Sequence, residues 1–115
     1  MHPPTKAENI YPRTKENIRC IFEHFFPEEK HSTIESHVVY VYDRRGLELN
    51  QIEYVARQVA ENRKEIEAIL APRGFGMATA YMMTASAIYG FPEMSKNSQS
   101  TIQEVKEHLN SVSVI

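Results

Sequence analysis

The amino-acid sequence predicts a mainly α fold (α+β): a compact helical domain of about four helices with one or two short β-strands. Three features lead to this prediction: an apolar helical period over residues 49–71, a phenylalanine-rich amphipathic segment that stops at Pro27, and an uncharged run over residues 74–92. A chain of 115 residues, of which 42% are hydrophobic, is long enough to bury a core without disulfide bonds. We therefore expect an extended N-terminal arm over residues 1–13 and a single helical domain over residues 14–115.

The first helix is expected directly after the arm. Residues 1–13 contain three prolines and no apolar period, which favours an extended conformation. Thr14 is a suitable N-cap for a helix that continues to Phe26 and ends before Pro27. Its apolar residues are spaced three and four apart, as one buried face requires: Ile18, Ile21, Phe22, Phe25 and Phe26. This helix should therefore bury a large aromatic surface.

A β-strand is expected over residues 37–43, because HVVYVYD is rich in β-branched and aromatic residues. Residues 43–46 follow with Asp first and Gly last, which suits a tight turn. A lone strand is unstable and needs a partner. The candidates are residues 111–115, residues 73–76, or the same strand of a second subunit.

Residues 49–71 show the clearest helical period, and Pro72 ends it. Two interpretations fit this spacing. One is a single unbroken amphipathic helix. The other resembles a helix-turn-helix over residues 52–70, in which a recognition helix begins near Asn62. On the second interpretation the DNA-binding residues are Arg57, Asn62, Arg63 and Lys64. Six basic and six acidic residues lie between Asp43 and Arg73, whereas phosphate binding requires a basic surface.

The uncharged run at residues 74–92 must be hidden from water, either inside the domain or against a partner. It predicts a helix over residues 77–89 that is apolar nearly all round and is stopped by Gly90 and Pro92. Glycine, threonine and serine dilute the run, and no cluster of positive charge flanks it, so we do not expect a membrane span. A last helix is expected from Ser100.

The composition reduces the number of functional classes that fit this chain. The net charge is −2 with both signs mixed along the chain, which gives no basic field for nucleic acid. A single cysteine and the absence of a secretory signal predict a cytoplasmic protein. Cys20 and His24 lie four residues apart on the first predicted helix, but a regular helix offers no oxyanion donors, so we interpret Cys20 as a packing residue. No paired ligand spacing predicts a metal site, and we expect no cofactor.

We therefore expect a small non-enzymatic protein-interaction or regulatory module, such as an adaptor, an inhibitor or a regulatory subunit. It would act through an apolar helical surface on a protein partner or on a second copy in a homodimer. The predicted interface residues are Tyr40, Tyr42, Met77, Tyr81, Met82, Ile88 and Phe91. The alternative is a DNA-binding transcriptional regulator that uses residues 52–70. A third class is a small enzyme or ligand-binding protein with a site around residues 73–76.

Overall fold

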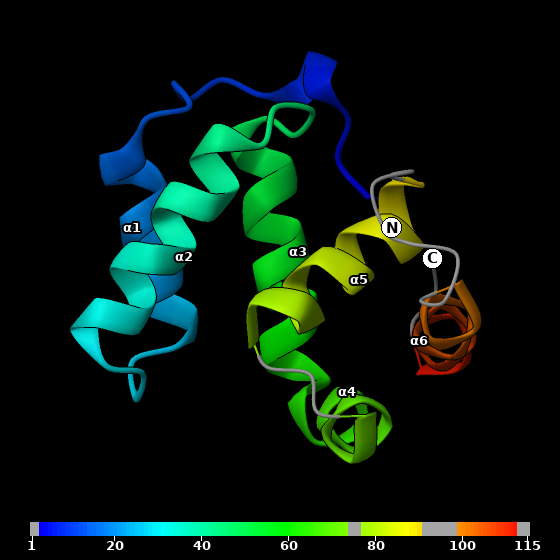
Figure 1. Cartoon of the computed structure of the whole chain (residues 1–115). Helices are drawn as coiled ribbons and strands as arrows, with labels where there is room; N and C mark the ends of the chain where they lie inside the picture. Colours follow the sequence, from blue (N-terminus) through cyan, green and yellow to red (C-terminus); the bar gives the residue numbers. More distant parts are fainter. Residues whose placement is uncertain (1–2, 74–76, 91–98, 113–115) are drawn as a thin grey trace. The chain divides into compact units, whose positions relative to one another are not determined.

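The computed structural model of the chain describes residues 3–73, 77–90 and 99–112 (Figure 1). Its regular elements are η1 (Lys6–Glu8), α1 (Lys15–Phe25), α2 (His31–Asp43), α3 (Leu49–Glu61), α4 (Arg63–Leu70), η2 (Ala71–Arg73), α5 (Met77–Tyr89) and α6 (Gln99–Val112). The mainly α prediction is confirmed. The described residues divide into two compact units, 3–60 and those from Glu61 onward. The prediction of one domain over residues 14–115 stays a prediction.

The predicted β-strand is wrong, because residues 37–43 form the second half of α2. No strand occurs in the described parts of the chain. The buried positions of α2 are spaced three and four apart: Ile34, His37, Val38 and Val41. This helical period outweighs the local β-propensity of valine and tyrosine, which depends strongly on context. Of the two strand partners proposed within the chain, residues 111–112 belong to α6 and residue 73 belongs to η2, while residues 74–76 and 113–115 lie outside the described residues.

The prediction of about four helices is also wrong, since the described residues contain six α-helices. One addition is α2. The other arises because the long period over residues 49–71 breaks at Asn62, whose backbone has φ −110° and ψ 25°. Asparagine competes with the helix through its own side chain and is a weak helix former. The unbroken-helix interpretation therefore fails, and α3 ends at Glu61 where α4 begins at Arg63.

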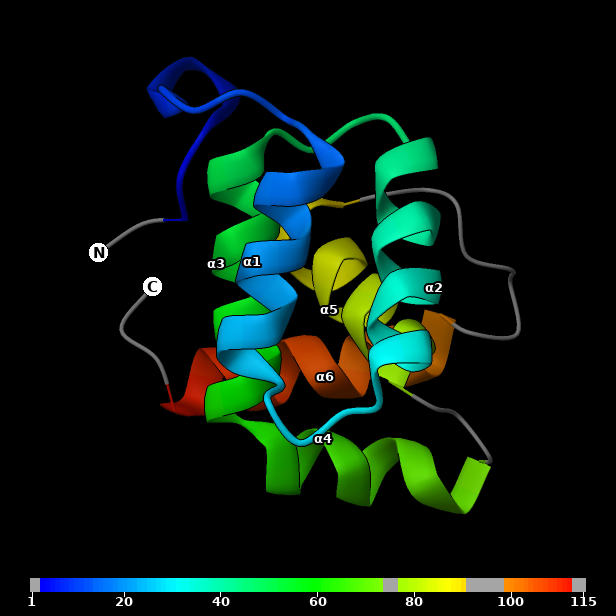
Figure 2. The ribbon, with the colours of Figure 1, turned by 90° about the vertical axis from the view of Figure 1, so that its left-hand side faces the viewer.

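In the unit of residues 3–60, α1 and α2 pack side by side, as Figures 1 and 2 show. Thr14 caps α1 as predicted, its hydroxyl accepting a hydrogen bond from the Asn17 backbone at 3.1 Å. Arg19 on α1 and Glu35 on α2 form a two-pronged ion pair at the surface. This hydrogen bonding lowers the pKa of the Glu35 carboxyl. The two helices bury a shared set of apolar side chains: Ile18, Phe22, Phe26, Ile34, Val38 and Val41.

Arg13, at the end of the N-terminal arm, closes the last turn of α2. Its Nε donates to the Leu47 carbonyl at 2.6 Å and its Nη1 to the Tyr42 carbonyl at 2.9 Å. Its Nη2 donates to the carbonyls of Val41 at 2.7 Å and Arg44 at 2.8 Å. The last carbonyls of a helix have no partner within the helix, and a cation there also interacts favourably with the helix dipole. One side chain thus satisfies four carbonyls at the α2–α3 connection.

The arm is attached to α3 as well. The Asn50 backbone N–H, in the first turn of α3, donates to Asn9 Oδ1 at 3.0 Å. The Asn50 side chain donates to the Thr5 carbonyl at 2.8 Å. Asn9 therefore supplies an N-terminal cap from 41 residues away in the sequence. Two polar anchors, Asn9 on α3 and Arg13 on α2, fix the arm to this unit.

In the unit that follows Glu61, α5 packs against α4 and α6, which also contact each other. Residues 80–86 of α5 are all buried, with exposed fractions between 0% and 7%. Seven consecutive residues make almost two full turns of an α-helix. Helix α5 is therefore covered on every side over this stretch. Gly90, with φ 70°, ends α5 in the left-handed conformation that favours glycine. The uncharged run is therefore hidden from water here, as the sequence predicts.

Replacing Arg13 with alanine should lower the free energy of unfolding by about 2 kcal/mol, because charge-assisted hydrogen bonds to several carbonyls are lost. Arg13→Lys should recover only part of this loss, since one ammonium cannot reach carbonyls on four residues. Urea unfolding followed by circular dichroism measures both changes. Arg57→Ala is the matched control, and an Arg13→Ala loss no larger than the control loss would contradict this role.

Stability should depend on pH through His37, which is 3% exposed. Burial lowers the pKa of its imidazole from 6.5 to about 4. The unfolded chain therefore takes up a proton between these values before the folded chain does. The free energy of unfolding should keep its full value above pH 6.5. It should fall by about 3 kcal/mol as the pH approaches 4.

His37→Phe isolates this effect, because the ring can keep its edge-to-face contact with Phe22, at 4.5 Å between ring centroids. The difference in unfolding free energy between the two proteins should shift with pH only within the window of the two imidazole pKa values. The Glu35 ion pair loses its contribution at lower pH, because the pKa of that carboxyl lies below 4.5. A constant difference from pH 7 to about pH 4 would contradict the assignment.

Candidate functional site

Cations gather on two tyrosines at the C-terminal end of α2. The Arg44 guanidinium lies 3.4 Å from the centroid of the Tyr40 ring. The Tyr42 ring has Lys15 Nζ at 5.2 Å and the Arg45 guanidinium at 5.7 Å. We call these five residues the cation–tyrosine cluster. Tyr40 and Tyr42 lie two residues apart, hence on different sides of the last turn, so the cluster surrounds the end of α2 rather than forming one flat face.

The cations of the cluster are exposed, and the tyrosines are half-buried. In the described parts of the chain, no ion pair engages Lys15, Arg44 or Arg45. Contact with an aromatic face holds a cation by about 0.5–1 kcal/mol at an exposed site without neutralising it. A guanidinium held this way still presents N–H donors that match a carboxylate or a phosphate. Asp43, exposed, and Glu48, half-buried, moderate the positive charge of this segment.

The residues predicted to form one interface belong to two different units. Tyr40 and Tyr42 belong to the cluster in the unit of residues 3–60. Tyr81 and Met82 lie on α5 in the other unit and are 1% and 5% exposed. Ile88 is half-buried near the end of α5. The side chain of Met77 and all of Phe91 lie outside the described residues. Their role in an interface stays a prediction, but Tyr81 and Met82 occupy packed positions in this structure.

The residues assigned to DNA on the helix-turn-helix interpretation lie near the break between α3 and α4. Arg57 forms an ion pair with Glu53 on the same helix. Arg63 donates to Glu67 at 2.9 Å. Asn62 forms the turn itself, and Lys64 is exposed. Two of the three cations thus already contact carboxylates, which weakens the attraction of this segment for phosphate.

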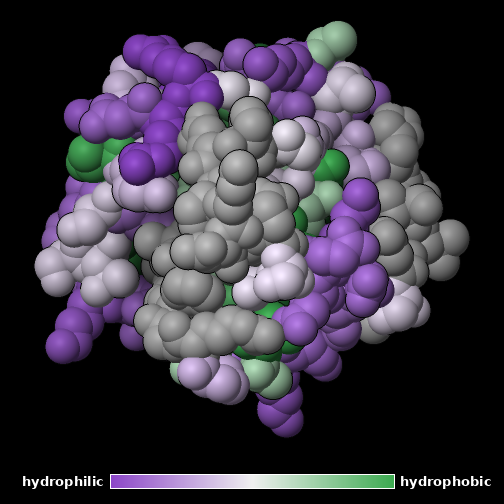
Figure 3. Space-filling view, turned by 45° about the vertical axis from the view of Figure 1, so that its right-hand side comes forward, coloured by the Kyte–Doolittle hydropathy of each residue, from purple (hydrophilic) through white to green (hydrophobic). Residues whose placement is uncertain are grey.

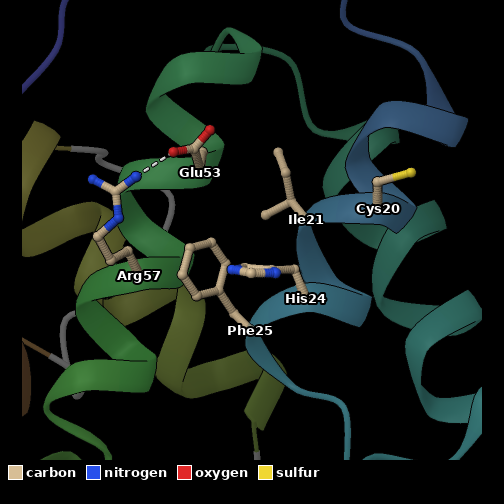
Figure 4. Close-up of a pocket in the computed structure, with 6 residues that line it drawn as sticks. All are labelled: Cys20, Ile21, His24, Phe25, Glu53 and Arg57. Carbon is tan, nitrogen blue, oxygen red and sulfur yellow. Dashed lines mark hydrogen bonds and ion pairs between the residues drawn. The ribbon is translucent and has the colours of Figure 1, made fainter.

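A groove of about 380 Å³ lies between α1 and α3 in the unit of residues 3–60 (Figure 4). Its lining residues are Cys20, Ile21, His24, Phe25, Glu53 and Arg57. Arg57 is held by Glu53 and lies 5.9 Å from the centroid of the Phe25 ring. In Figure 4 the Cys20 sulfur points away from His24, whose ring points toward Phe25. The two side chains therefore diverge, and this geometry does not activate a thiolate.

The sequence indicates some of these residues and not others. Tyr40 and Tyr42 stand out as aromatic residues in a mainly apolar segment. The role of Arg13 and Lys15 depends on contacts with residues 41–47, about thirty positions away, and no local pattern reveals it. The groove likewise depends on how α3 lies against α1. The spacing of apolar residues in the sequence indicates which face of a helix is apolar, but not where two helices leave space between them.

On the face drawn in Figure 3, the described residues are largely hydrophilic, with small hydrophobic areas between them. Among the described residues, no group of three or more His, Cys, Asp or Glu side chains could hold a metal ion. Within the same residues, no helix has the length and apolar character that a membrane span requires. The chain matches no protein-family model, no curated protein and no solved structure.

Because α5 is packed, substitutions at its buried residues should change the free energy of unfolding in ways that an interface role does not predict. Thr84 is fully buried, and no described group accepts or donates a hydrogen bond at its hydroxyl. Thr84→Val should raise the free energy of unfolding by about 1 kcal/mol, because an unsatisfied buried hydroxyl is removed at equal size. Met83→Ala should lower it by about 2–5 kcal/mol. The exposed Thr33→Val is the control and should gain nothing; an unstable Thr84→Val protein would contradict the packing.

Proposed function

We propose that this protein is a small non-enzymatic protein-interaction module that binds its partner through the cation–tyrosine cluster at the end of α2. The observation that carries the proposal is the set of exposed cations held on Tyr40 and Tyr42, none of which forms an ion pair within the described parts of the chain. Arginine and tyrosine are enriched among the residues that dominate binding energy in protein interfaces. Lys15 adds a third positive charge to the same end of the helix.

The cluster is built to bind without reorganising. Arg13 fixes the carbonyls of Val41, Tyr42 and Arg44, so the backbone that carries the tyrosines and arginines is already ordered. Stacking on a ring restricts the Arg44 side chain before any partner arrives. Binding therefore avoids much of the entropic cost of ordering a long side chain, about 0.5–1.5 kcal/mol each. Acidic groups on the partner would complement the unpaired cations.

A non-enzymatic role is supported by how the polar groups are used. Among the described residues, the ion pairs outside the cluster are either local, such as Arg63 with Glu67, or tie helices together, such as Arg19 with Glu35. Cys20 and His24, the one sequence pair with catalytic character, diverge at the groove. These arrangements suit a scaffold that presents a surface rather than a site that transfers protons.

The test is site-specific photo-cross-linking in the native host. A photoreactive phenylalanine analogue replaces Val39, which is 43% exposed and precedes Tyr40. Cross-linked proteins are quantified by mass spectrometry with and without the charge reversal Arg44→Glu/Arg45→Glu. The matched control, Arg63→Glu/Lys64→Glu, changes the net charge equally on α4. We expect the double reversal at the cluster to reduce one specific cross-linked protein at least tenfold, about 1.4 kcal/mol, with little effect of the control.

Equal cross-linking in both variants would contradict the proposed surface. A loss confined to Arg63→Glu/Lys64→Glu, together with lower affinity for duplex DNA at low salt, would instead favour the DNA-binding alternative. Circular dichroism of the purified variants separates a binding defect from a folding defect, since all four substituted side chains are exposed or half-exposed.

A further inference from the structure

Three cations surround a single tyrosine ring at the end of α2. Lys15 Nζ lies 5.2 Å from the centroid of the Tyr42 ring, the Arg13 guanidinium 5.6 Å and the Arg45 guanidinium 5.7 Å. Any two of these groups are therefore at most about 11 Å apart, little more than the Debye length of about 8 Å at physiological ionic strength, so their positive potentials add around the ring. We call Tyr42 and these three cations the Tyr42 site.

The positive charge of the Tyr42 site is available to a ligand. Lys15 and Arg45 are exposed, and no ion pair or hydrogen bond engages either side chain within the described parts of the chain. Arg13 donates to carbonyl groups, which carry no net charge, so it keeps its own positive charge. Asp43 follows Tyr42 in the sequence, yet it forms no ion pair with these cations. An anion would therefore meet three cations that are not yet neutralised.

The end of a helix is normally unfavourable for an anion, because the last carbonyls carry partial negative charge there. In this structure Arg13 donates to the carbonyls of Val41, Tyr42 and Arg44. Its guanidinium therefore offsets the carbonyl charge. The N–H donors of Lys15 and Arg45 stay free for a ligand, and the obstacle that α2 itself would present is removed.

A phosphate monoester matches these donors better than a carboxylate. It carries a charge of about −1.5 to −2 at pH 7 and three acceptor oxygens, whereas a carboxylate has one charge and two oxygens. A guanidinium binds two phosphate oxygens in a fork, and an ammonium binds as a compact point charge. One phosphate group thus has enough charge and enough oxygens for Arg45 and Lys15 together. One carboxylate would leave one of the two cations without a full partner.

The shape of the surrounding surface favours a peptide over a lipid bilayer. Tyr40, with the Arg44 guanidinium 3.4 Å from its ring centroid, lies on a different side of the last turn of α2 from Tyr42. A flat anionic membrane would contact one of these sides. A peptide chain can follow the end of the helix and contact both.

We propose that the Tyr42 site binds the phosphate group of a phosphorylated side chain on the partner protein, with Arg45 and Lys15 as the direct ligands and Arg13 as a fixed positive charge beside them. This inference rests on the interaction function proposed above and names the chemistry of the partner. Recognition of phosphorylated motifs by clustered cations is a recurring mode of peptide binding. Arg44 on Tyr40 binds an acidic side chain close to the phosphorylated residue. Phosphorylation of the partner therefore switches the interaction on.

A titration followed by nuclear magnetic resonance tests the site with a defined probe, a capped tripeptide with phosphoserine between two alanines, at about pH 7.5 and constant ionic strength. The Tyr42 ring and Arg45 Nε–H signals should shift, with a dissociation constant on the order of 1 mM. The same tripeptide with glutamate should bind at least about fivefold more weakly. Lys15→Gln/Arg45→Gln should weaken binding of the phosphoserine peptide at least about tenfold. The matched control, Lys6→Gln/Lys30→Gln, removes two exposed cations from the same unit and should leave the affinity unchanged.

Equal affinity for the two peptides, or no binding of the phosphoserine peptide up to about 20 mM, would overturn the phosphate assignment. It would leave the proposed surface intact, because carboxylates would still complement the cluster. Tighter binding to vesicles of phosphatidylcholine with phosphatidylserine than to the peptide, lost in Lys15→Gln/Arg45→Gln, would assign the site to a membrane and overturn the inference as well.

Phosphatase treatment separates this inference from the proposed function. In a lysate of the native host, treatment before irradiation should reduce the specific protein cross-linked at position 39 at least about tenfold, as Arg44→Glu/Arg45→Glu does. Mass spectrometry should find a phosphorylated residue in the partner peptide that carries the cross-link. A cross-link that the charge reversal removes but phosphatase leaves intact would retain the proposed function and overturn the phosphate inference. A cross-link that neither change affects would contradict both.

Discussion

The unit of residues 3–60 depends on one guanidinium. Arg13 donates to four carbonyls at the end of α2 and at the connection to α3, and no other described side chain reaches this set. Planar geometry matters here, since five N–H donors in a fixed fork serve several acceptors that a lysine ammonium would not reach together. The same side chain fixes the arm, lies 5.6 Å from the Tyr42 ring centroid and orders the backbone that carries Arg44.

The proposed surface follows from this constraint. On the α2 side, the ordered end of the helix holds Tyr40 and Tyr42 with their cations. On the arm side, the Arg13 and Asn9 anchors display Ile10 and Tyr11 to solvent. The proposed surface does not include the apolar helix α5, whose residues 80–86 are packed away from water.

The sequence predicts what depends on local periodicity. The helix from Lys15 and its Thr14 cap follow from spacing and cap chemistry, and so does the burial of residues 80–86 in an uncharged run. Prediction from the sequence fails where two local signals compete. In residues 37–43 valine and tyrosine favour a strand, but the helical period extends back through Ile34, so the segment is helical. At Asn62 the spacing of apolar residues remains helical, but the backbone leaves the helical conformation. The arm anchors and the groove join residues that are far apart in the sequence, and no local pattern reveals them.

The most direct test of this account is the solvent exchange of the Arg13 side chain. Nuclear magnetic resonance can follow the Nε–H protons of individual arginines in the folded protein. The Arg13 Nε–H, bonded to the Leu47 carbonyl at 2.6 Å, should exchange at least about tenfold more slowly than that of the exposed Arg45. Exchange of both protons at the same rate would show that Arg13 is not fixed to α2. The ordered arm and the proposed surface would then lose their common support.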